Sequence, residues 1–143
     1  MFVCLLTLIA ASVAAQQISL GSLFDRYEVN PRWAQLPAGQ EWGASTSWVD
    51  ADGKGTVAVL VRQAPYVRLF TTAGTPVASW GDAGLFTLAH SVHFDPDGSI
   101  WVVDPNAHAA FKFDRTGTLL QTIGTKGTRG DNDSRTAFNE PNA

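Results

Sequence analysis

The stretch that decides the fold is residues 88–124, LAHSVHFDPDGSIWVVDPNAHAAFKFDRTGTLLQTIG. Four apolar runs of strand length lie in it, at 91–94, 100–103, 109–113 and 119–123. They alternate with turn residues such as Asp97-Gly98 and Thr116-Gly117. This alternation predicts an antiparallel meander of four strands. The run 100–103 is apolar at every position, which predicts a strand whose sheet is covered on both faces.

A related unit lies 43 residues upstream, with strands expected at 45–50, 56–61, 66–70 and 76–80. The positions that correspond are Gly55 and Gly98, Val57 and Ile100, Phe70 and Phe113, Gly74 and Gly117, Gly81 and Gly124 and, after a further slip of two residues, Asp50 and Asp95. Four short strands in a period of this length are typical of a β-propeller blade. A blade buries its faces only against neighbouring blades, so at least three are normally needed. The sequence therefore predicts an all-β fold with about two blades, as a fragment of a larger propeller.

The repeat divides the chain into five expected segments. These are a signal peptide at 1–15, an extended lead-in at 16–44, blade 1 at 45–81, blade 2 at 82–124, and a loop with the truncated start of blade 3 at 125–143. The first segment is apolar and ends in small residues, which is typical of secretion, and it is too short to span a membrane. It contains Cys4, so the mature chain is expected to lack cysteine. The protein is therefore predicted to be secreted or periplasmic, without a membrane span after cleavage.

Charge and aromatic content bear on which ligands the protein could bind. The formal net charge is −3, and the 10 Lys and Arg residues are scattered, so a basic nucleic-acid surface is excluded. Trp33 and Trp42 lie in the lead-in beside prolines. They could stack on sugars, but packing onto the propeller is the better interpretation of isolated aromatic residues.

Two side chains are candidates for a site. His90 directly precedes the innermost strand of blade 2, and these strands line the axis of a propeller. His90 and His93 are three residues apart, so on a strand they point to opposite faces. A zinc site needs three or four ligands, so His90 would need partners from other blades, and the residue pattern alone favours a hydrogen-bonded histidine. Arg62 ends the apolar run at 57–61 and must be paired or face a wet cavity. An anion-binding role and a salt bridge stay equally open.

The chain from about Trp33 onward resembles the start of the six-bladed, NHL-repeat propellers of the peptidyl-α-hydroxyglycine α-amidating lyase type. The resemblance lies in EWGASTSWVDADG at 41–53, VAVLVRQAPYVRLF at 57–70, and, in blade 2, a histidine at its start, W-V-x-D, x-H-x-x-F-K-F and L-x-T-x-G-x-x-G. It implies a zinc lyase that cleaves an α-hydroxyglycine-extended peptide into a peptide amide and glyoxylate. His90 matches the first of three zinc histidines, and Arg62 matches an active-site arginine. A structural calcium, bound by backbone carbonyls, would fall near Ser47 and Val92.

The chain departs from that family at several positions. Arg62 is followed by Gln63-Ala64-Pro65, and His90 by Ser91, where the family has other residues. The catalytic tyrosine and the other two zinc histidines belong to later blades, so this fragment alone is expected to be inactive. The alternative is a non-catalytic propeller that binds protein, peptide or carbohydrate on its rim. Either complete protein is expected to be a monomer, and the residues of the later blades would discriminate between them.

Overall fold

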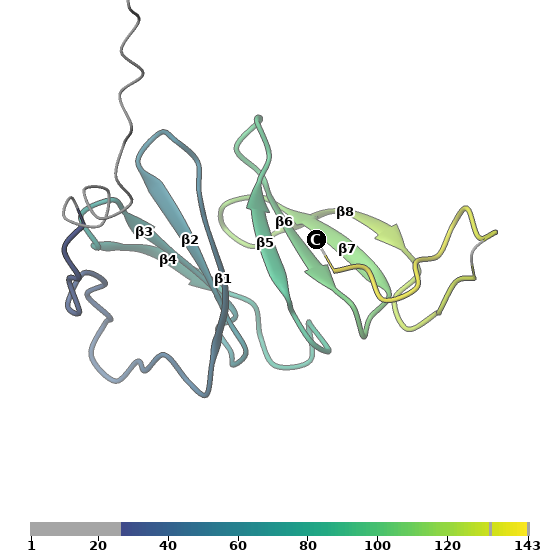
Figure 1. Cartoon of the computed structure of the whole chain (residues 1–143), viewed down its shortest axis with the longest axis horizontal. Helices are drawn as coiled ribbons and strands as arrows, with labels where there is room; N and C mark the ends of the chain where they lie inside the picture. Colours follow the sequence, from purple (N-terminus) through teal and green to yellow (C-terminus); the bar gives the residue numbers. More distant parts are fainter. Residues whose placement is uncertain (1–26, 132, 143) are drawn as a thin grey trace, which may run out of the picture. The chain divides into compact units, whose positions relative to one another are not determined.

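Two antiparallel four-stranded sheets make up the fold in the computed structural model, which describes residues 27–131 and 133–142. The first sheet consists of β1 (Thr46–Ala51), β2 (Thr56–Val61), β3 (Val67–Thr71) and β4 (Pro76–Trp80). The second consists of β5 (Ser91–Phe94), β6 (Ile100–Asp104), β7 (Ala109–Phe113) and β8 (Leu119–Gly124). In each sheet the strands pair in chain order (Figure 1). The all-β prediction is confirmed, and every expected strand appears with bounds within one residue.

Only a short part of the N-terminal region lies within the described residues. The expected signal peptide at 1–15, with Cys4, lies outside the described residues, as does the start of the lead-in. Residues 27–30 belong to a separate N-terminal unit and form no helix or strand. Across residues 27–131 and 133–142, no helix is long and apolar enough to cross a membrane.

The 43-residue repeat recurs in the pairing of the strands. Val57 on β2 pairs with Phe70 on β3, and Ile100 on β6 pairs with Phe113 on β7. The register between the third and fourth strands also becomes irregular at the same repeat position, immediately before Phe70 and Phe113. The two sheets are therefore built to one plan.

The first strands follow the same period, so the two-residue slip expected from the sequence is wrong. Ala51 on β1 pairs with Val57, and 43 residues later Phe94 on β5 pairs with Ile100. Asp52, not Asp50, therefore corresponds to Asp95. The slip fails because hydrogen bonding to the second strand sets the register, whereas the sequence comparison matched residue types.

The two sheets pack against each other through a shared core of apolar side chains. Among the described strands, the backbones come close only where β5 lies beside β1 and β2 (Figure 1). The shared core includes Ala58 and Leu60 of the first sheet and Val92 of the second. Farther along the chain in each sheet, aromatic rings fill the space. The centroids of the Trp80 ring on β4 and the Phe113 ring on β7 are 4.9 Å apart.

The part of the lead-in at 31–44 covers the other face of the first sheet. Its Trp33 and Trp42 rings lie 5.6 and 5.8 Å from the Phe70 ring, centroid to centroid. Together with Leu36 they pack over the buried Val59. The predicted packing role of the two tryptophans is thereby confirmed.

Two glycines at equivalent repeat positions show a parallel between the two sheets. The lead-in packs on the first sheet at the position where the first sheet packs on the second. Gly74 has a φ of 83°, and a Cβ atom there would lie 1.6 Å from the backbone oxygen of Trp33. Gly117 has a φ of 92°, and a Cβ atom there would lie 2.7 Å from Cγ of Trp80. Each glycine thus permits a close approach by the element that covers its own sheet.

Candidate functional site

His90 lies directly before β5, with its side chain half-buried. Its backbone N–H donates to the carbonyl oxygen of Val103 at 2.9 Å, which fixes the residue at the start of the strand. Its ring centroid lies 6.2 Å from that of Trp48. The imidazole Nδ1 is buried and has no hydrogen-bond partner. Because a buried polar atom normally has a partner, this nitrogen is the part of the residue that a ligand would satisfy.

A second unpartnered polar atom adjoins it in sequence. The hydroxyl of Ser91, a fully buried residue, also has no hydrogen-bond partner. By contrast, the Ser47 hydroxyl on β1 lies 3.4 Å from the carbonyl oxygen of Ala89 and 3.5 Å from that of Leu60. The start of β5, where it adjoins β1, therefore holds two side-chain polar atoms whose hydrogen-bonding capacity is unused.

The aromatic ring of Trp48 contacts both neighbouring histidines. The centroid of the His93 ring lies 5.4 Å from that of Trp48, at a steep interplanar angle of 65°. The structure thus brings His90 and His93 to the same tryptophan, although their odd spacing predicts opposite faces of a strand. In residues 27–131 and 133–142, no three His, Cys, Asp or Glu side chains gather as a metal site. This cluster can supply at most part of a metal centre.

Arg62 follows β2 directly and is exposed. Its backbone N–H donates to the carbonyl oxygen of Ser45 at 3.0 Å. Its guanidinium forms no ion pair within the part of the chain that the structure describes. Of the two interpretations left open by the sequence, the salt bridge is therefore not seen there, and the side chain is free to meet a ligand from solvent.

Ser47 and Val92, the residues named for a calcium site, lie on the adjacent strands β1 and β5 but at different repeat positions. Ser47 lies where the register between β1 and β2 is irregular. Val92 is fully buried and pairs with Val102, which makes Val49 its counterpart in the first sheet. The expected equivalence of the two residues came from the same two-residue slip and is wrong. The calcium site itself stays a prediction.

Two buried charged residues were missed as parts of a candidate site. Asp104 and Arg68 are 0% and 3% exposed, respectively. Asp104 ends the W-V-x-D pattern, and nothing in the sequence indicated that its carboxylate accepts hydrogen bonds from the backbone of Thr87 and Leu88. Arg68 could have been found from the repeat, because its counterpart is the core residue Phe111. No protein-family model and no curated protein matches this chain.

Proposed function

We propose that the two sheets are consecutive blades of a β-propeller of the NHL type. Three observations support this: the shared 43-residue register, the packing of one sheet on the next, and the approach of the sheets at β1 and β5. Blades arranged around an axis are closest at their first strands and are separated at their fourth. On this proposal β1 and β5 line the axis, and His90 lies next to it.

We infer further that the complete protein is a zinc-dependent lyase that converts a peptidyl-α-hydroxyglycine into a peptide amide and glyoxylate. The observation that carries this proposal is the buried, unpartnered Nδ1 of His90 at the start of β5. An imidazole nitrogen is a common zinc ligand. The described residues fit one ligand of such a site and do not complete it, so the remaining ligands would have to come from other blades.

Each residue of this chain has a limited role in the proposed reaction. A zinc ion held by His90 and by ligands from other blades would supply a Lewis acid for the hydroxyl oxygen of the substrate. Arg62, exposed at the end of β2, would bind and orient an anionic group of the peptide substrate. The backbone carbonyls of Ser47 and Val92 would contribute to a calcium site that joins β1 to β5. Export to the periplasm or medium belongs to the same proposal and rests on the predicted signal peptide.

A second candidate is a non-catalytic propeller that binds a peptide, protein or carbohydrate. This alternative requires no metal, so it needs no ligands from other blades. On this alternative, His90 and Arg62 would contact the bound partner without turnover.

Metal analysis together with a lyase assay of the protein from its complete gene separates the two candidates. The lyase is expected to hold zinc in stoichiometric amount and to release glyoxylate from a peptidyl-α-hydroxyglycine. His90→Ala should lose both properties, whereas His108→Ala should keep them, because Nδ1 of His108 accepts a hydrogen bond from the backbone of Glu140. Arg62→Ala should lower turnover about 100-fold with little change in thermal stability. If the complete protein holds no zinc and releases no glyoxylate, the lyase is excluded and the binding propeller is supported.

A further inference from the structure

Arg68 on β3 is a buried arginine without an acidic partner. It is only 3% exposed, and its Nη1 has no hydrogen-bond partner. Its Nε donates to the carbonyl oxygen of Pro65 over 3.4 Å, which is a long hydrogen bond. The guanidinium carbon lies 5.5 Å from the centre of the Trp42 ring. Among the described residues, no ion pair involves Arg68.

This arrangement leaves a positive charge without compensation. Burial lowers the pKa of Arg68, but a guanidinium remains protonated in proteins at ordinary pH. A buried charge is costly unless an opposite charge and hydrogen bonds satisfy it. The Trp42 ring offsets only part of that cost through its cation–π contact. Arg68 is therefore suited to bind an anion.

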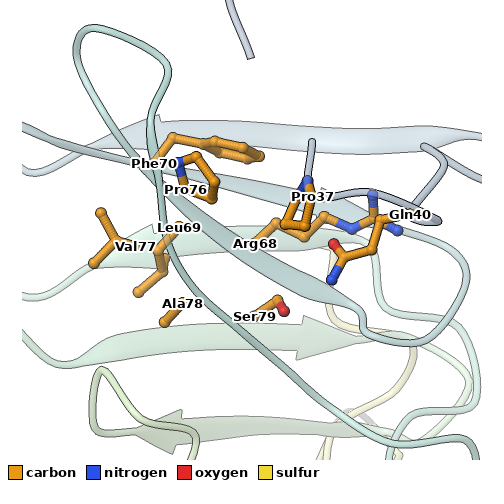
Figure 2. A pocket seen from close by; sticks show the side chains of 9 residues that line it. All are labelled: Pro37, Gln40, Arg68, Leu69, Phe70, Pro76, Val77, Ala78 and Ser79. Atoms are coloured by element: carbon orange, nitrogen blue, oxygen red, sulfur yellow. The ribbon is translucent and has the colours of Figure 1, made fainter. Parts of the chain in front are cut away.

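A cavity of about 320 Å³ provides room for such an anion beside Arg68. It lies between the lead-in and the strands β3 and β4, and we call it the Arg68 pocket. Figure 2 shows the side chains of Arg68 and Gln40 at one end, and those of Phe70, Pro76 and Val77 at the other. One end can therefore donate hydrogen bonds, and the other is apolar.

A neighbouring cavity of about 230 Å³ also adjoins Arg68, and an acidic side chain is among the residues that line it. Glu41 and Gln63 line it. Glu41 is exposed and forms no ion pair with Arg68 in the described structure. The carboxylate of Glu41 is therefore a competitor whose effect an experiment can remove.

We propose that the Arg68 pocket binds a small organic monocarboxylate, whose carboxylate accepts hydrogen bonds from the Arg68 guanidinium and whose apolar part packs on Phe70, Pro76 and Val77. Arginine matches a carboxylate in charge and in planar shape. A single cation and a neutral amide balance one negative charge, so a phosphate dianion fits less well. This site is separate from the axis-lining cluster at His90 and does not rest on the proposed lyase activity.

Titration calorimetry with benzoate and benzamide tests the proposal on the unmodified chain. The two probes have similar shape, and only benzoate carries a charge. Benzoate is expected to bind with one-to-one stoichiometry and at least tenfold more tightly than benzamide or inorganic phosphate. Because Trp42 adjoins Arg68, tryptophan fluorescence should change with the same affinity. Equal affinity for the two aromatic probes, or tighter binding of phosphate, would overturn the proposal.

Variants then assign the binding to Arg68. Arg68→Gln is expected to weaken benzoate binding at least tenfold, whereas Lys54→Gln, which removes an exposed cation in a turn, should leave it unchanged. Glu41→Gln should bind benzoate at least as tightly as the wild type. If benzoate binds only to Glu41→Gln, the Glu41 carboxylate occupies the Arg68 pocket in the wild type. That result would refute the proposal that the pocket binds a free monocarboxylate. If Arg68→Gln does not fold, the benzoate and benzamide comparison on the wild type decides.

Discussion

At the scale of the residue, the buried Asp104 joins two loops of the second sheet. Its Oδ2 accepts hydrogen bonds from the backbone N–H groups of Thr87 and Leu88, at 2.5 and 2.9 Å. Its Oδ1 accepts one from the N–H of Ala107 at 2.9 Å. The carboxylate thus connects the segment before β5 to the turn after β6, and it positions the residues that lead to His90.

Asp104→Ala is predicted to lower the free energy of unfolding by about 3 kcal/mol, because three backbone donors lose their acceptor and a buried, unpaired donor costs about 1–3 kcal/mol. Urea denaturation monitored by circular dichroism measures this change. Asp82→Ala is the control, since Asp82 is exposed, and its effect should stay within about 0.5 kcal/mol. A loss below about 1 kcal/mol for Asp104→Ala would contradict the role assigned to the carboxylate.

Individual buried charges are the feature that the sequence predicted least well. The apolar pattern of one strand predicts which residues are inside, but it does not show which polar groups become buried with them. For Arg68, only the comparison with Phe111 in the other copy of the repeat carries that signal. Arg68 lies between Val67 and Leu69, and a strand with alternating faces would place it toward solvent. It is buried because the lead-in, which has no periodic pattern, folds over that face. The unpartnered Nδ1 of His90 depends in the same way on contacts between distant segments.

At the scale of the element, aspartates organise the hairpin turns of the second sheet. The Asp114 carboxylate accepts hydrogen bonds from the Thr116 hydroxyl at 2.7 Å and from the backbone N–H groups of Thr116 and Thr118 at 2.8 and 2.9 Å. Led by the Thr116 hydroxyl, these bonds lower the pKa of Asp114 to about 2. Asp97 accepts bonds from the Ser99 hydroxyl and from Lys112, which lower its pKa well below the ordinary value.

These shifts predict a loss of stability in acid. A carboxyl whose pKa is lower in the folded state than in the unfolded state stabilises the fold above the unfolded value, which is 3.8 for aspartate. The contribution of Asp114 should therefore be complete above about pH 4 and should disappear as the pH falls through about 2. Urea denaturation midpoints measured from pH 6 down to pH 2 should therefore decrease between about pH 4 and pH 2. Asp114→Asn should show a smaller fall, and an identical fall in both proteins would exclude Asp114 as a contributor.

Strands and turns are the level at which the sequence was most informative. Apolar runs bounded by Asp-Gly and Thr-Gly turns predict β5 to β8, because local turn geometry and alternating burial both act over a few residues. The register of β1 was predicted less well. Ser47 lies at an irregularity in the pairing, and hydrogen bonds to β2 outweigh the similarity between Asp50 and Asp95.

At the scale of the whole molecule, the face with which the first sheet packs on the second has its repeat counterpart on the far face of the second sheet. Ala58 and Leu60 of the first sheet lie in the shared core. Their repeat counterparts are Trp101 and Val103 of the second sheet. Trp80 in the core likewise corresponds to Ile123, which is 41% exposed. The repeat alone predicts that Trp80 and Ile123 correspond. The three-dimensional structure is needed to show that the second sheet packs over Trp80, whereas Ile123 stays partly exposed.

Trp80→Ala is predicted to lower the free energy of unfolding of the 143-residue chain by about 3–5 kcal/mol, the usual cost of removing a large buried aromatic side chain. The ring is 8% exposed and contacts Phe113, and its Nε1 donates to the carbonyl oxygen of Arg115 at 3.2 Å. Ile123→Ala is the matched control at the same repeat position and should cost less than about 1 kcal/mol, because the side chain is 41% exposed and the substitution removes fewer buried atoms. Urea denaturation of both variants measures the difference. Equal losses would mean that the face around Ile123 is covered as fully as the face around Trp80, and the packing described for these two sheets would then be incomplete.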